Sequence, residues 1–163
     1  MNDTIRTLYA FNFVYCQSLF ADIGAEEMLK QPSQAINPPA WLLGHLAICT
    51  DYALQMMTLD KQLPAEWHEE FGPRSQPLSQ KHPYPSKQEM WDAYAAGHKA
   101  VELASREVSA ETLQKPNPLP FKFLQENLPT TGDLLGHLMT THEASHLGHL
   151  SNWRRQMGRK PLL

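Results

Sequence analysis

Histidine is the residue type whose positions in this chain most directly suggest chemistry. The chain has eight histidines among 163 residues, and four of them lie between His137 and His149. On a helix with about 100° per residue, His142 and His146 fall at the centre of one apolar stripe, one turn apart. His149 falls on the shoulder of that stripe, and His137 points well away from it. Two imidazoles spaced i and i+4 present their nitrogens on one side of a helix, where both can bind the same metal ion.

His45 supplies a third imidazole from a separate segment. It lies near the middle of another apolar stripe, about 20–40° from Trp41 and from Tyr52. A buried histidine is often simply neutral and hydrogen-bonded, and that structural role stays open for each of the three. Three inward imidazoles from two helices nevertheless favour a divalent-metal site of His45, His142 and His146, with a fourth position left for water or substrate. Imidazole-only ligation suits Zn, Ni, Cu or Fe, and the sequence does not choose among them, although zinc and nickel are the ions that we expect first.

The segment H-E-A-S-H, which ends at His146, also matches H-E-x-x-H, the helix motif of zinc proteases. The extended form of that motif requires Gly at position 149 and His at position 152, but the chain has His149 and Asn152. The other class of zinc proteases needs a downstream Glu, and no Asp or Glu follows Glu143. A third ligand is therefore expected upstream, where His45 is the best-placed candidate.

Four long segments with helical periodicity must position these side chains. Each carries apolar residues on one stripe at about 100° per residue, and no long stretch alternates with period two. Ser86, followed by Glu89 three residues later, predicts a capping box, and Gly158 predicts a helix end. The expected helices cover residues 2–30, 38–59, 86–109 and 130–158. The sequence therefore predicts an all-α four-helix bundle.

Composition limits the classes of protein to consider. A chain of 163 residues and 18.6 kDa has the size of one domain, and we expect a single domain over residues 1–163. Its 14 Lys+Arg and 17 Asp+Glu give a net charge of −3, which argues against a nucleic-acid-binding protein. The two cysteines, Cys16 and Cys49, cannot form a disulfide framework, and we interpret them as buried apolar thiols. With no segment that could span a membrane and no signal peptide, we expect a cytoplasmic protein.

Two motifs resemble those of the DinB/YfiT-like superfamily of metal-dependent bundles, and the resemblance covers nearly the whole chain. The segment W-L-L-G-H-L, which contains His45, is similar to the second-helix motif of that family. The segment H-E-A-S-H-L-G, which contains His142 and His146, is similar to its fourth-helix motif. The resemblance implies that these three histidines are the metal ligands and that the helices run up-down-down-up. The family commonly has Gln at the place of His149, for which we expect a role outside the ligand set.

The resemblance also implies a function. Members of the superfamily include S-transferases and isomerases that use low-molecular-weight thiols, and members are frequently homodimers. We therefore expect a metal-dependent enzyme that activates a thiol or a water, as a thiol S-transferase or a hydrolase, and acts on a small molecule. The alternative is a non-catalytic binding or structural bundle that the metal only stabilises. Three aromatic residues outside the main stripe of the first helix could form the apolar face of a homodimer: Phe11, Phe13 and Tyr15.

Other polar residues are candidates for the lining of the site. Asn12, Tyr52 and Tyr94 lie on inner stripes and could line a pocket, although each is first expected to be a hydrogen-bonded core group. Glu143 could orient a water or a ligand, and its first expected role is that of a solvated or dimer-facing carboxylate.

Overall fold

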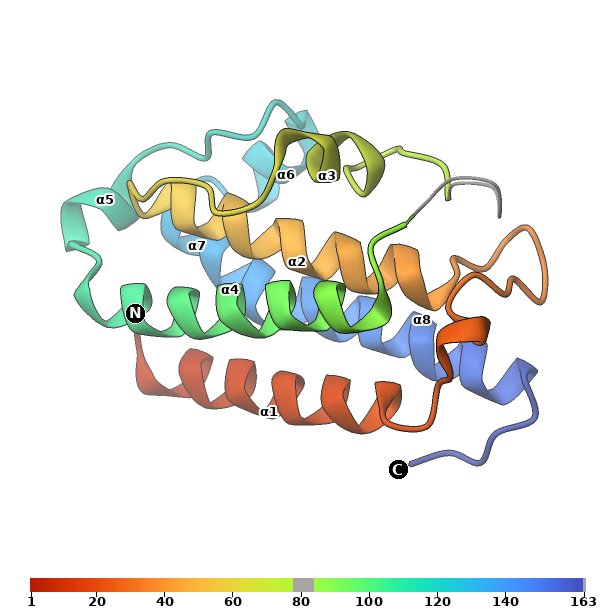
Figure 1. Cartoon of the computed structure of the whole chain (residues 1–163). Coiled ribbons are helices and arrows are strands. Elements are labelled where there is room, and N and C mark those ends of the chain that lie inside the picture. The colour runs from red at the N-terminus through yellow and green to blue at the C-terminus, as the bar shows by residue number, and fades with distance from the viewer. Residues whose placement is uncertain (78–83, 163) are drawn as a thin grey trace.

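Long helices make up the body of the molecule, for which the computed structural model describes residues 1–77 and 84–162 (Figure 1). In chain order they are α1 (Asp3–Phe20), α2 (Pro39–Met56), α4 (Lys87–Glu107) and α8 (Glu143–Gln156). α2 and α4 run side by side in one direction and α1 and α8 run in the opposite direction, which is an up-down-down-up order (Figure 1). The predicted all-α fold is confirmed, since the described residues contain no strand.

Short helical elements lie between the long helices. Where the sequence predicts only long loops, at residues 60–85 and 110–129, the structure has α3 (Ala65–Glu70), α5 (Ala110–Gln114) and α6 (Lys122–Asn127). The other two, η1 (Ala25–Glu27) and α7 (Thr131–His137), lie within the predicted first and fourth helices. The described residues therefore contain more helices than the four predicted. None of these helices combines the length and the apolar character that a membrane crossing requires.

Local sequence signals set two helix ends as predicted. The Ser86 hydroxyl accepts a hydrogen bond from the Glu89 backbone N–H, and the Glu89 carboxylate accepts one from the Ser86 backbone N–H. This reciprocal pair is the predicted capping box at the start of α4. Gly158 follows the end of α8 with a φ of 78°, a left-handed conformation that glycine adopts without steric cost.

The first helix is shorter than predicted, because it ends at Phe20 and not near residue 30. Lys87 Nζ donates to the carbonyl oxygens of Phe20 at 2.8 Å and Ile23 at 2.7 Å. A side chain from α4 thus satisfies carbonyls at the end of α1, which would otherwise lack a partner. Apolar periodicity did not reveal this end because Ile23 and Met28 remain buried after the helix stops.

A π-helical turn, Leu138–His142, connects α7 to α8, where the sequence predicts a regular α-helix. In a π turn each N–H bonds to the carbonyl five residues back, so the turn holds one residue more than an α turn. The Asn12 side-chain amide on α1 donates to the Thr140 carbonyl oxygen at 3.2 Å, and the Thr140 hydroxyl donates to the Gly136 carbonyl oxygen at 2.6 Å. Side chains therefore satisfy carbonyls in and before the wider turn.

α2 is the most deeply buried of the long helices, and it also anchors the connection that follows it. The Asp51 carboxylate accepts hydrogen bonds from the backbone N–H groups of Gln62 and Leu63, both at 2.9 Å. His68 Nε2, on α3, lies 3.0 Å from the same carboxylate. These contacts hold α3 and the segment before it against α2.

Candidate metal centre

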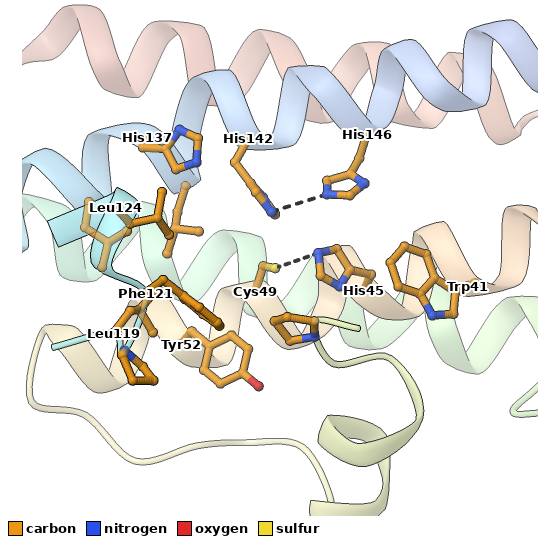
Figure 2. A pocket seen from close by; sticks show the side chains of 14 residues that line it. Trp41, His45, Cys49, Tyr52, Leu119, Phe121, Leu124, His137, His142 and His146 are labelled. Atoms are coloured by element: carbon orange, nitrogen blue, oxygen red, sulfur yellow. Dashed lines mark hydrogen bonds between the residues drawn. The ribbon is translucent and has the colours of Figure 1, made fainter. Parts of the chain in front are cut away.

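Three histidine side chains converge on the wall of one cavity (Figure 2). His45 lies on α2, His142 ends the π turn, and His146 lies one turn further on, in α8. The ring centroid of His45 lies 5.4 Å from that of His142 and 4.6 Å from that of His146, and the latter two are 4.6 Å apart. One nitrogen from each ring lies within 4.8 Å of the other two. The structure thus brings the three predicted residues close enough together to hold one ion.

The ring of His45 is fixed in one tautomer. Its Nδ1 lies 2.7 Å from the Phe71 carbonyl oxygen, and because a carbonyl only accepts, Nδ1 carries the hydrogen. Nε2 therefore keeps its lone pair, and Figure 2 shows this atom on the side of the ring that faces His142 and His146. Trp41 stacks on the same ring with centroids 4.7 Å apart and planes inclined by 8°. A hydrogen bond from the non-ligating nitrogen is typical of metal-binding histidines.

His142 and His146 turn their Nε2 atoms toward each other at 3.2 Å (Figure 2). Two nitrogens of a tetrahedral zinc site, at Zn–N distances near 2.0–2.1 Å, lie about 3.3 Å apart. Both Nδ1 atoms are buried and have no hydrogen-bond partner among the described residues, so a neutral pair of rings leaves at least one N–H unpaired. This arrangement of donors fits a divalent ion that prefers imidazole.

Burial lowers the pKa of all three imidazoles. The pKa of His142 falls to about 3 and that of His146 to about 2, mainly through burial and then through the neighbouring imidazoles. Burial also lowers the pKa of His45, while the hydrogen bond to the Phe71 carbonyl acts in the opposite direction. The rings are therefore neutral at pH 7, which is the form that binds a metal.

We expect metal binding at pH 6.5 to release almost no protons from His142 and His146, and fewer from His45 than an ordinary histidine would release. Three histidines with the ordinary pKa of about 6.5 would each be half protonated and would release about 1.5 protons together. Because all three pKa values are lowered, the enthalpy of zinc binding should depend less on the ionisation enthalpy of the buffer than it would for three ordinary histidines. Isothermal titration calorimetry in several buffers measures this. The Cys49→Ser protein is the control for an ionising thiol, and release of more than one proton by that protein would contradict the expectation.

His137 also lines the cavity, although the helical wheel places it well away from His142. The two ring centroids are only 5.5 Å apart. The π turn is the physical reason, since residues five apart lie on the same side of a π turn but about 140° apart on an α-helix. His137 Nδ1 lies 2.6 Å from the Thr141 hydroxyl. The structure therefore corrects the direction predicted for His137, which still lies outside the group of three.

His149 is exposed and lies outside the group that could hold the ion. Its ring meets that of His146 edge-on, with centroids 5.7 Å apart. It is therefore a neighbour of one of the three histidines and not a member of their cluster.

Glu143 is buried, so the expectation of a solvated or dimer-facing carboxylate is wrong. The Tyr94 hydroxyl donates to its carboxylate at 2.6 Å, and His98 Nε2 lies 3.9 Å away. Burial raises the pKa of Glu143 to about 8, while hydrogen bonds from Tyr94 and Asn12 act to lower it. Asn12 and Tyr94 are thus hydrogen-bonded core groups, as first expected, and Tyr52 lines the cavity.

Cys49 is a residue of the site that the sequence interpretation missed. It lines the cavity, with Sγ 3.6 Å from Nε2 of His45 (Figure 2), whereas Cys16 is fully buried as expected. The missed signal was the spacing, because His45 and Cys49 lie i and i+4 on α2, as His142 and His146 do on the last helical segment.

The cavity beside the histidines has a volume of about 550 Å³. Small-molecule sites commonly have volumes of about 300–1,000 Å³. In Figure 2 the rings of His142 and His146 come from above and that of His45 from below, while Leu119 and Phe121 line the part of the cavity away from Trp41. The histidine nitrogens thus face a space large enough for an organic ligand.

Comparison with known proteins matches the chain to a protein family. The family model described as the DinB superfamily matches residues 15–150, a stretch that includes all three histidines of the cluster. No curated protein matches the chain.

Proposed function

The chain belongs to the DinB superfamily, and we propose that it is a metal-dependent enzyme whose His45, His142 and His146 bind a zinc or nickel ion. The observation that carries this proposal is the convergence of the three imidazoles on the wall of a cavity of about 550 Å³. Three protein ligands with one position left open is the arrangement of catalytic zinc sites.

The proposed chemistry is activation of a thiol or a water for transfer to, or hydrolysis of, a small molecule. A divalent ion at this position would lower the pKa of a thiol or water beside it and so supply a nucleophile at neutral pH. The protein orients the His45 ring and shields one of its faces. The Phe71 carbonyl holds His45 in the tautomer that can bind the ion, and Trp41 covers the face of that ring.

A metal-stabilised bundle without catalysis is the second candidate, and Cys49 is the observation that favours it. Cys49 Sγ lies 3.6 Å from His45 Nε2 but outside the group of atoms that all lie within 4.8 Å of one another, so a movement of its side chain would be needed to make it a fourth protein ligand. Four protein ligands close the coordination sphere, as in structural zinc sites.

Cobalt(II) substitution distinguishes the two candidates. If the fourth position is open, the cobalt protein should lack thiolate-to-cobalt charge-transfer absorption until 2-mercaptoethanol is added. If Cys49 occupies that position, the absorption should be present from the start, be lost in the Cys49→Ser protein, and not respond to added thiol. The second result would overturn the enzyme proposal.

We also propose that the protein is a cytoplasmic homodimer. An apolar face of α1 is available for a second copy, because Leu8, Phe11 and Val14 are all exposed there. Phe13 does not belong to this face, since its ring packs 5.5 Å from that of Trp91 on α4. The net charge of −3 supports a small-molecule substrate over a nucleic acid.

A further inference from the structure

We infer that the cavity selects an uncharged organic thiol with an apolar body and rejects thiols that carry a carboxylate close to that body. This inference rests on the proposed function, because it places the thiol at the open position beside the three histidines. It adds the substrate class, which the chemistry of the histidines alone does not determine.

The cavity has a polar part and an apolar part. The three histidines of the cluster and Cys49 form the polar part, and the lining has two further polar side chains, Tyr52 and His137. The apolar part is formed by the loop before α6, by α6 itself and by the end of α7 and the π turn. Its side chains are Leu119, Pro120, Phe121, Leu124, Leu134 and Leu138. A ligand with its thiol at the histidines would therefore place its body against aliphatic and aromatic side chains.

The lining offers no ion-pair partner for a carboxylate on that body. None of the described residues that line the cavity is Lys, Arg, Asp or Glu. His137 also lines the cavity, and its Nδ1 lies 2.6 Å from the Thr141 hydroxyl. A carboxylate in this space would lose its hydration without gaining an ion pair, which disfavours its binding strongly.

Two cationic side chains, Arg74 and Lys61, lie near the cavity but do not line it, and each lies over an aromatic ring. The guanidinium of Arg74 stacks over the ring of Phe121 at 5.7 Å from its centroid, and Lys61 Nζ lies 5.3 Å from the ring centroid of Tyr52. Both rings line the cavity, whereas neither cation does. Small thiols built from several charged groups therefore match this lining poorly, and a compact aryl or branched alkyl thiol matches it well.

Two thiols of nearly equal size test the inference. The probes are 2-phenylethanethiol and 4-(2-mercaptoethyl)benzoate, which share the thiol and the ring and differ by one carboxylate. Each is titrated under argon into the cobalt(II) protein at pH 7.5, and thiolate-to-cobalt absorption reports binding. We expect the uncharged thiol to bind at least about 100-fold more tightly, because the carboxylate would be buried without an ion-pair partner.

The possible results separate this inference from the proposed function. Equal affinity, or tighter binding of the benzoate, would overturn the selectivity while leaving the open position intact. If neither probe nor 2-mercaptoethanol changes the spectrum, the open position itself is absent and the proposed function fails.

A pair of variants on α6 locates the source of the selectivity. Leu124 lines the cavity, whereas Phe123 beside it is 73% exposed and does not. Leu124→Lys should reduce the preference for the uncharged thiol by about tenfold or more by supplying a cation inside the cavity, and Phe123→Lys should leave the preference unchanged. An equal effect of both substitutions would show that the apolar lining is not the cause and would contradict the inference.

Discussion

The His146→Ala protein is expected to bind zinc or nickel at least about 100-fold more weakly than the wild-type protein. Loss of a group that only orients a metal ligand typically reduces affinity 10–100-fold, so loss of a ligand itself should cost at least the upper end of that range. In this site the substitution leaves two imidazoles, one from each of two helical segments, whose ring centroids are 5.4 Å apart. Metal titration with a competing chelator on protein purified without a His-tag measures the change.

His149→Ala is the matched control for this prediction. The two histidines lie three residues apart on α8, and both substitutions give the helix an alanine. His149 is exposed and lies outside the group of three, so its removal should leave metal affinity unchanged. Equal loss in both variants would indicate an indirect effect through the helix. Unchanged affinity in His146→Ala would remove His146 from the ligand set.

The Gly44→Ala substitution is expected to destabilise the protein by about 1–3 kcal/mol, the usual cost of forcing an extra carbon into a packed core. A Cβ at position 44 would lie 2.5–2.6 Å from three ring carbons of Phe71, which is fully buried. Either the ring or the helix must move. Urea unfolding of the metal-free protein, followed by circular dichroism, gives the change in free energy.

The same substitution should also weaken metal binding by about 10–100-fold. Phe71 presents the carbonyl oxygen that accepts from His45 Nδ1, so displacement of Phe71 disturbs the orientation of the neighbouring ring. Gly148→Ala is the control, because a Cβ at this exposed helical position has no heavy atom within 4 Å. That variant should gain up to about 1 kcal/mol from helix propensity and bind metal as the wild type does. A Gly44→Ala protein as stable as Gly148→Ala would refute the packing argument.

The sequence was sufficient to predict the cluster because α-helical geometry holds where the cluster needs it. His142 and His146 are separated by one regular turn, so their shared direction follows from their spacing, and His45 lies on an apolar stripe of a helix that the structure confirms. Periodicity of 100° per residue is enough for such pairs.

The two wrong predictions, for the direction of His137 and for the exposure of Glu143, have a common physical origin in contacts between helices. His137 was misplaced because a π turn lies between it and His142, and Asn12 from another helix bonds to a carbonyl within that turn. Glu143 was assigned to solvent because a lone carboxylate is costly to bury, yet Tyr94 from α4 supplies the hydrogen bond that offsets part of the cost. Neither partner is near in sequence, so spacing along one helix could not reveal them.

The π turn makes the side chains of α7 that line the cavity independent of the position of His146 on α8, whereas one continuous α-helix would fix one by the other. An α-helix fixes the angular relation of every residue to every other, so the position of His146 on α8 would dictate which side chains of α7 face the cavity. The additional residue in the turn changes the angle between α7 and α8 about the helix axis. His137 and Leu138 therefore face the cavity independently of the register of α8. Loss or gain of a single residue here would therefore rotate this wall of the cavity while leaving the geometry at His146 in place, so the lining could change without a change in the histidine cluster.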